Sequence, residues 1–215
     1  MTSWWHDERL DAAVQAVRDS DARSVVDLGC GDGDLIVRLL GEHAVTRILG
    51  VDICQEALAR LRRRLQEQDG GGTGEEGPAR VRLVCASMID ADPAMQGFDC
   101  AVLLETIEHL DPGDLSRLER ALFRRMTPRT AVITTPNAEF NGLLGVPPHR
   151  FRHPGHRFEW PRAKFRHWAH GVAARNGYAV RCTDIAGSHP DLGGASQMAV
   201  FTRPAGHAGQ APRNV

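Results

Sequence analysis

The sequence predicts an α/β protein with an open, twisted and mostly parallel sheet. Two observations support this fold class. Strand-like apolar runs alternate with stretches of helical periodicity over the first 136 residues, and two strand-like runs close the pattern. At 215 residues the chain is long enough for one domain with a full core. We therefore expect a doubly wound, seven-stranded sheet with an antiparallel strand at its end, all within a single domain of residues 1–203.

The strands are predicted from short runs rich in Val, Ile and Leu that end at Gly, Asp, Glu or Pro. In order along the chain, the predicted strands are 24–29, 46–53, 80–86, 97–105, 130–136, 178–185 and 197–203. The helices are predicted where apolar residues recur at helical spacing, and Pro161 suits the first turn of the last one. The predicted helices are 7–18, 34–43, 54–68, 115–126 and 161–177.

Three stretches lack such periodicity. Residues 69–79 are rich in glycine and poor in apolar side chains, which is typical of a mobile loop. Residues 137–160 combine Gly, Pro, His and Arg over a length that exceeds most connections, so we expect an inserted active-site segment. Residues 204–215 are rich in Pro, Gly and Ala, and we expect a flexible tail.

The composition excludes some classes of protein and bounds the location. The formal net charge of −1 provides no overall basic field for gripping duplex nucleic acid. No apolar run is long enough to span a membrane, and the charged first residues do not form the apolar segment of a signal peptide. The five cysteines are odd in number and include no Cys-x-x-Cys pair, as expected of reduced thiols. We expect a cytoplasmic protein without a membrane partner.

The turn after the first strand indicates a nucleotide site. Asp27 ends that strand, and Gly29, Gly31 and Gly33 lie in the turn before the next helix. In an open α/β sheet, a ligand binds where such a turn lets the backbone approach closely. An acid before the glycines would repel a pyrophosphate and attract an amino group. Asp52, at the end of the second strand, suits the two hydroxyls of a ribose.

This acid–Gly-x-Gly-x-Gly pattern, with its second acid, resembles the class I S-adenosylmethionine-dependent methyltransferases. The resemblance implies their fold and their cofactor, S-adenosylmethionine, which has an ammonium and a ribose but no phosphate. It further implies that residues after the third strand hold the adenine. The implied cofactor-binding residues are Asp27, Gly29, Gly31, Asp52, Ile53, Ser87 and Met88.

A second group of polar residues follows the fourth strand, in the stretch VLLETIEHLD. Glu105, Glu108 and His109 are spaced i, i+3 and i+4, so a helix would place them on one face beside the methyl donor. Two carboxylates and an imidazole form a hard donor set that suits Mg²⁺ or Mn²⁺ better than structural zinc. The same residues could instead only shape a substrate pocket, and the motif alone does not decide between these interpretations.

The later stretch FRHPGHRFEWPRAKFRHWA makes a resemblance more specific, to the HEN (Hua-enhancer) type RNA methyltransferases. Residues that match the family pattern there are Arg152, His153, His156, Arg157, Phe158, Glu159, Trp160 and Arg162. Other matching stretches are ERL, DLGCGDG, GVDI, ETIEHLD, TTPNAEFN and SQMAVF. Two departures stand out. Gly155 replaces a family Asp that could support His156, and Pro161 replaces Thr.

The resemblance implies metal-dependent methylation of the 2′-hydroxyl on the 3′-terminal nucleotide of RNA, which would protect or mark RNA ends. The implied catalytic residues, which are also the implied ligands of Mn²⁺ or Mg²⁺, are Glu105, Glu108, His109 and His156. Chelation by the free 2′- and 3′-hydroxyls would explain specificity for RNA ends. Either histidine could also accept the proton. The matched region covers a methyltransferase domain only, and longer bacterial relatives suggest a kinase, phosphatase or ligase of RNA-end repair as a partner.

The segment 149–166 holds five arginines and three histidines among aromatic residues, which suits contact with single-stranded RNA. Core packing is an equally good interpretation for Phe158, Trp160 and Phe165. Two rival functions remain open at this stage. One is a small-molecule O-methyltransferase, and the other is a catalytically silent cofactor-binding module that serves an RNA-repair partner.

Overall fold

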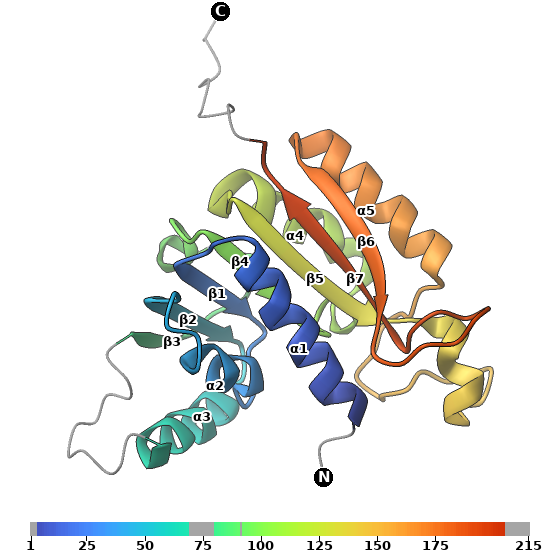
Figure 1. Ribbon diagram of the computed structural model, residues 1–215, viewed down its shortest axis with the longest axis horizontal. Coiled ribbons are helices and arrows are strands. Elements are labelled where there is room, and N and C mark those ends of the chain that lie inside the picture. Colours follow the sequence, from blue (N-terminus) through green and yellow to red (C-terminus); the bar gives the residue numbers. More distant parts are fainter. Residues whose placement is uncertain (1–3, 69–79, 91, 205–215) are drawn as a thin grey trace, which may run out of the picture.

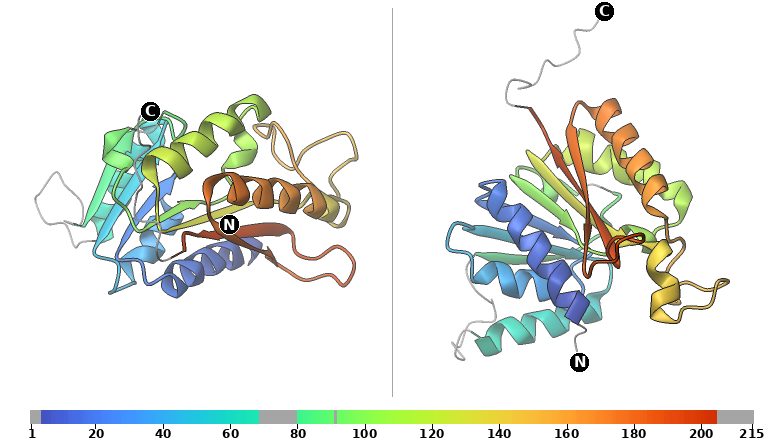
Figure 2. Two further views of the ribbon diagram at one scale, coloured as in Figure 1. Left: turned by 90° about the horizontal axis from the view of Figure 1, so that it is seen from above. Right: turned by 45° about the vertical axis from the view of Figure 1, so that its right-hand side comes forward.

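The computed structural model describes residues 4–68, 80–90 and 92–204 as a three-layer α/β/α arrangement. Helices α1 (Trp4–Asp19), α2 (Asp34–Leu40) and α3 (Gln55–Gln68) cover one face of the sheet. Helices α4 (Leu115–Arg120) and α5 (Arg162–Asn176) cover the other face. Figure 2 shows α1 and α5 on opposite sides of the sheet. The doubly wound α/β architecture is therefore confirmed.

The central sheet has seven strands in the order β3-β2-β1-β4-β5-β7-β6 (Figure 1). The strands are β1 (Ser24–Leu28), β2 (Arg47–Asp52), β3 (Val81–Cys85), β4 (Cys100–Leu103), β5 (Thr130–Pro136), β6 (Ala179–Ile185) and β7 (Ser196–Thr202). Strands β1 to β5 pair in parallel, whereas β7 pairs antiparallel with both β5 and β6. The predicted closing strand pair is thus confirmed, and its second strand lies between β5 and β6.

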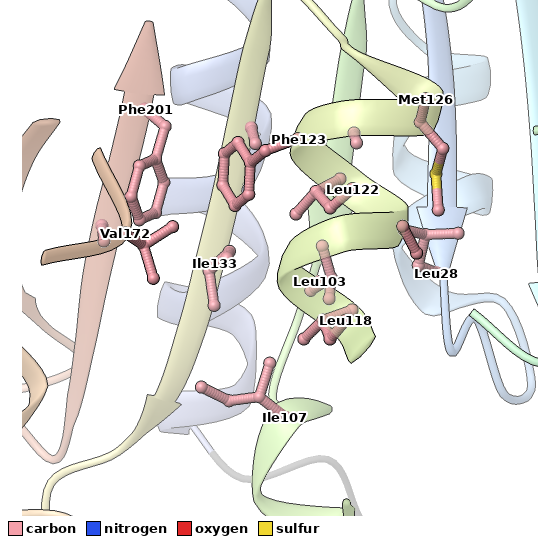
Figure 3. Close-up of a cluster of buried hydrophobic side chains, with 14 of the residues drawn as sticks. Leu28, Leu103, Ile107, Leu118, Leu122, Phe123, Met126, Ile133, Val172 and Phe201 are labelled. Atoms are coloured by element: carbon pink, nitrogen blue, oxygen red, sulfur yellow. The ribbon is translucent and has the colours of Figure 1, made fainter. Parts of the chain in front are cut away.

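Side chains of the central strands alternate between two buried layers. Val26 and Leu28 of β1 pack in the layer with α4 and α5, whereas Val25 packs in the layer with α1, α2 and α3. Figure 3 shows the first of these layers, where Phe123 and Phe201 meet from different elements. Burial of both faces accounts for the nearly continuous apolar runs from which these strands were predicted. The packed layers fix the strand ends, where the site is built.

Several element boundaries differ from those predicted, each for a local reason. Strand β4 covers only Cys100–Leu103 rather than 97–105. Before it, the Asp99 carboxylate accepts hydrogen bonds from the backbone of Arg23 and Ser24. After it, Glu105 adopts a left-handed φ of 51°. Helix α2 ends at Leu40 rather than at residue 43, and Pro161 precedes α5 instead of lying in its first turn.

The predicted helix 115–126 is present as α4 followed by the π-helix η4 (Ala121–Met126). Four further short helices lie between the main elements of the described chain, namely η1 (Pro93–Met95), η2 (Ile107–His109), η3 (Pro112–Asp114) and η5 (Ala138–Leu144). The rest of the 137–160 segment is largely irregular, as predicted. The expected mobile loop 69–79 and all but the first residue of the expected tail 204–215 lie outside the described residues. The five cysteines are free thiols.

Candidate functional site

The site lies at the carboxyl ends of the parallel strands, where open α/β sheets bind ligands. A cavity of about 390 Å³ opens there. It is lined by Gly29, Val51, Asp52, Ile53, Ala86, Ser87, Met88, Glu105, Thr106, His109 and Leu110. Five of the seven predicted cofactor residues line it, namely Gly29, Asp52, Ile53, Ser87 and Met88. Asp27 and Gly31 are not among the lining residues.

The turn after β1 depends on its glycines. Gly29 has a φ of 80°, and a Cβ at this position would clash with the side chain of Thr106. The backbone N–H groups of Gly29 and Cys30 donate to the Val51 carbonyl, at 2.8 and 3.0 Å. The close approach of this turn to Thr106 therefore requires a residue without a side chain.

Two acidic residues, Asp52 and Asp27, lie beside this turn in different surroundings. Asp52 accepts hydrogen bonds from the backbone N–H groups of Gly31 and Cys54, both at 2.8 Å. Asp27 is 2% exposed. Burial, and then the neighbouring Asp52 carboxylate, raise the pKa of Asp27 from 3.8 to about 7. A cation placed against Asp27 would relieve this penalty, which is the complementarity that an ammonium group requires.

Glu105 is positioned by residues that are distant in sequence. Its backbone N–H donates to Thr134 Oγ1 at 2.8 Å. One carboxylate oxygen, Oε2, accepts from Arg9 of α1 at 3.1 Å and from Ser196 of β7 at 2.9 Å. The other oxygen, Oε1, is buried and has no hydrogen-bond partner within the part of the chain that is described. Glu105 thus presents one unsatisfied acceptor, and its carboxylate is held by two other elements.

Glu108 is completely buried. Its Oε2 accepts from Thr135 Oγ1 at 3.0 Å, while Oε1 is buried without a partner among the described side and main chains. Burial, and then the charge of Glu105, raise the pKa of Glu108 well above 4.5. Glu105 and Glu108 thus each keep one buried oxygen without a partner in the described structure, an arrangement that a bound cation would stabilise.

The prediction that Glu105, Glu108 and His109 share one face of a helix was wrong. Glu105 has left-handed backbone geometry, and only Ile107–His109 form a single 3₁₀ turn. The sharp turn nevertheless directs both Glu105 and His109 toward the cavity, since both line it. The tight turn after β4, rather than helical periodicity, brings these side chains into one site.

A cluster of three imidazoles adjoins the carboxylates. His109, His153 and His156 each offer one nitrogen, and these atoms lie within 4.8 Å of one another. His109 Nδ1 donates to the Gly155 carbonyl at 3.2 Å, and His156 Nδ1 donates to Glu159 Oε1 at 2.6 Å. Burial, and then the neighbouring His156, lower the pKa of His109. In the neutral imidazoles, these contacts leave Nε2 of His109 and of His156 as the nitrogen with the lone pair.

The structure adds three residues that were outside the predicted metal ligands, one of which, Arg9, matches a family arginine and is a weaker candidate for holding cofactor or RNA. His153 joins the imidazole cluster, Glu159 holds His156, and Arg9 pairs with Glu105. Their only sequence signal was that all three matched the family pattern. Glu159 supports His156 directly, through the contact with His156 Nδ1. A Cβ on Gly155 would press on His153 and His109, at 3.0 and 3.2 Å from their Nδ1 atoms.

The aromatic residues of segment 149–166 divide into two groups. Phe158, Trp160 and Phe165 are buried, so the core-packing interpretation holds for these three. Phe151 is 47% exposed. Among the arginines, Arg152 is hydrogen-bonded to Asn141 and the Ala195 carbonyl, whereas Arg150 and Arg157 are exposed. Fewer residues of this segment are therefore exposed for contact with RNA than the sequence suggested.

Comparison with known proteins identifies the family. Residues 25–129 match a family model described as a methyltransferase domain. The small RNA 2′-O-methyltransferases of Gallus gallus and Mus musculus are each 37% identical to this chain. The matched regions cover 91% and 89% of this chain but only 53% and 50% of those proteins, so the chain spans about half their length.

The chain also matches a solved structure over nearly the whole length of both chains. The methyltransferase domain of bacterial CtHen1 is 34% identical, with a TM-score of 0.80, and the match covers 92% of this chain and 99% of that one. This likeness and the sheet order confirm the class I S-adenosylmethionine-dependent methyltransferase fold that the sequence predicts. The chain therefore belongs to the family of Hen1 methyltransferase domains.

Proposed function

We propose that this chain transfers a methyl group from S-adenosylmethionine to the 2′-hydroxyl of the 3′-terminal nucleotide of RNA. The observation that supports this proposal best is that the cavity adjoins the cluster of carboxylates and imidazoles. The cavity at the Gly-rich turn shares Glu105 and His109 with the cluster of buried carboxylates and imidazoles. A methyl donor in the cavity would thus lie next to residues that can orient a hydroxyl.

The cavity residues fit the parts of the proposed cofactor. Asp52, Ile53, Ser87 and Met88 line the side formed by β2 and β3, which suits a ribose and an adenine. We assign the cofactor's ammonium to the side of Asp27, because a positive charge there offsets the burial of this carboxyl group. Gly31 has a φ of 51°, and a Cβ added to it would meet no atom within 4 Å, so the turn leaves open space for the ligand there.

The donor set fits a divalent cation. Glu105 Oε1 and Glu108 Oε1 are buried without partners in the described structure, and Nε2 of His109 and of His156 carry lone pairs. Such a mixed oxygen and nitrogen set suits Mn²⁺ or Mg²⁺. We propose that these four residues hold the ion. When bound, the ion supplies positive charge that favours ionisation of a nearby hydroxyl.

The surrounding residues keep this arrangement in place. Arg9 and Ser196 fix one oxygen of Glu105, which directs the other oxygen inward. Glu159 fixes the tautomer and ring orientation of His156. The sulfonium of the cofactor is already electrophilic, so the chain mainly positions the acceptor hydroxyl in line with the methyl group. Arg150, Phe151 and Arg157 are exposed and could contact an RNA strand, although Arg157 Nε also lies 3.6 Å from Asp111 Oδ1.

The proposal is tested by methyl transfer from radiolabelled S-adenosylmethionine to a short RNA with a free 3′ end, with Mn²⁺ and with EDTA. We expect labelling that requires the metal and is absent from an RNA that ends in a 2′-deoxynucleotide. A phenol serves as the competing small-molecule acceptor. Efficient labelling of the phenol without labelling of RNA would contradict the proposal.

Three further features remain predictions. They are association with a kinase, phosphatase or ligase of RNA-end repair, a cytoplasmic location, and the extent of the single domain over residues 1–203. Among the described helices, none is both long and apolar enough to cross a bilayer. Co-purification with the RNA-repair enzymes of the same cell would support the first prediction.

A further inference from the structure

Gly155 lies between two of the three clustered histidines and contacts each through a different backbone group. Its N–H is 3.0 Å from His153 Nδ1, and its carbonyl oxygen is 3.2 Å from His109 Nδ1. A Cβ at this position would lie 3.0 Å from His153 Nδ1 and 3.2 Å from His109 Nδ1, so a side chain would require these rings to shift. One glycine therefore sets the hydrogen-bonding state of both imidazoles.

These contacts give the two histidines opposite tautomers. A backbone N–H can only donate, so His153 Nδ1 accepts, and its ring hydrogen must lie on Nε2. A carbonyl can only accept, so His109 Nδ1 carries the hydrogen, and its Nε2 has a free lone pair. His156 is in the same state as His109, because its Nδ1 donates to the Glu159 carboxylate. Two imidazoles thus present lone pairs, while His153 presents an N–H group.

Exposure differs across this group of residues. Glu108 is completely buried, the side chain of His156 is 8% exposed, and His109 and His153 are both exposed. Arg157 is also exposed, and its backbone N–H is anchored to the Glu108 carbonyl at 2.7 Å. The exposed Nε2–H of His153 and the exposed Arg157 side chain offer donors to an anionic group at this exposed rim of the cluster. On an RNA end whose ribose reaches inward, the group at the rim is the last phosphate.

We propose that His153 binds the phosphodiester linking the last two nucleotides of the RNA, and donates from Nε2–H to a non-bridging oxygen. This inference rests on the proposed function and specifies how the acceptor is positioned. It makes His153 a substrate-binding residue rather than a further ligand of the cation. It also explains why a small-molecule acceptor without a phosphate would be held poorly.

The test measures RNA binding by fluorescence anisotropy in the presence of S-adenosylhomocysteine, so that turnover is not required. Two RNAs with free 3′ ends differ only in the last linkage, which is a phosphodiester or an uncharged methylphosphonate. The variants are His153→Ala, which removes the donor, and His153→Gln, which keeps an N–H near the Nε2 position. His170→Ala, an exposed histidine on α5, is the matched control.

We expect the methylphosphonate to weaken binding to the unmodified protein about tenfold or more, which is typical of a lost hydrogen bond to a charged group. His153→Ala should bind the phosphodiester RNA about tenfold more weakly than the unmodified protein does. This variant should bind the methylphosphonate RNA with the same affinity as the phosphodiester RNA. His153→Gln should stay within about threefold of the unmodified protein, since it keeps the donor. His170→Ala should match the unmodified protein on both RNAs.

Two results would overturn the inference alone. One is an equal loss for His153→Ala on both RNAs, and the other is about a tenfold loss of Mn²⁺ affinity in this variant, as expected of a ligand. Failure of the proposed function is seen separately, as absence of methyl transfer by the unmodified protein to any RNA. In that case the binding measurements still decide the role of His153. If the unmodified protein binds neither RNA, both proposals are overturned.

Discussion

At the scale of single residues, Asp27 links the cofactor site to stability. Its pKa is about 7 in the folded protein because of burial and of Asp52, compared with 3.8 for a free side chain. The folded state therefore binds a proton more tightly than the unfolded state. Asp27 thus lowers the free energy of unfolding by about 1.4 kcal/mol per pH unit as the pH rises from about 4 to about 7.

Asp27→Asn should remove this pH dependence. Without cofactor, we expect the variant to match the unmodified protein in melting temperature below about pH 4, where Asp27 is protonated in both states, and to exceed it at about pH 8. Its affinity for S-adenosylmethionine should fall about tenfold, since the ammonium loses its counter-charge. Thermal unfolding and titration calorimetry check the two parts, with the exposed Asp19→Asn as control. An equal difference in melting temperature at both pH values would contradict the account.

Glu108 should link metal binding to proton release. Burial and the neighbouring Glu105 raise its pKa, so the metal-free protein holds Glu108 protonated to a higher pH than usual. Binding of Mn²⁺ to the carboxylate must displace that proton, so affinity should increase with pH. Calorimetry in buffers of different ionisation enthalpy measures the protons released.

The variant Glu108→Gln isolates this effect. It keeps the shape of the side chain, and we expect unchanged or higher stability but at least about a tenfold loss of Mn²⁺ affinity. Glu119→Gln is the control, because Glu119 accepts a hydrogen bond from Arg175 and is not among the proposed ligands. This variant should leave Mn²⁺ affinity unchanged. Full Mn²⁺ affinity in Glu108→Gln would remove Glu108 from the proposed ligands.

At the scale of elements, the turn between β1 and α2 offers a comparison of two glycines. Both Gly29 and Gly31 have a positive φ, but only at Gly29 would a Cβ clash with a neighbour, Thr106. Gly31→Ala should lower the free energy of unfolding by about 1 kcal/mol, the usual cost of left-handed geometry. Gly29→Ala should lower it by roughly 2–4 kcal/mol, because steric overlap adds to the backbone strain. Urea unfolding measures both, and equal losses would contradict the proposed packing.

The elements also show what could be predicted from the sequence. Runs such as Ser24–Leu28 are buried on both faces, so their composition alone indicates strands. The end of β4 could not be predicted in this way. Glu105 turns left-handed against the sequence pattern, and its contacts are with Arg9 and Ser196, 96 and 91 residues away. Spacing along the chain contains no information about such contacts.

The cofactor side of the site was easier to predict than the metal side. Gly29 and Asp52 belong to local motifs whose geometry is set by one turn and one strand end. His153 meets His109 only because the irregular segment after β5 folds back over the turn after β4. The grouping of His109 with His156 came from resemblance to a family, and neither hydrophobic periodicity nor residue spacing would have found it.

At the scale of the whole molecule, the acceptor should be an RNA end with both ribose hydroxyls free. A 3′-phosphate would remove the free 3′-hydroxyl, so a cation held by Glu105 and Glu108 could no longer chelate the 2′- and 3′-hydroxyls together. We expect at least about a hundredfold slower methylation of an RNA with a 3′-phosphate than of the same RNA with a 3′-hydroxyl. Initial rates with the two RNAs measure this ratio, and similar rates would contradict the proposed site.

The central claim is methylation of the terminal 2′-hydroxyl, and periodate oxidation of the RNA product tests it most directly. Periodate cleaves a 3′-terminal ribose only when its two hydroxyls are free. After reaction with S-adenosylmethionine and Mn²⁺, we predict that the 3′ end resists periodate, and that EDTA in the reaction leaves it sensitive. A labelled RNA whose 3′ end is still cleaved by periodate would contradict the account, because the methyl group would then be elsewhere.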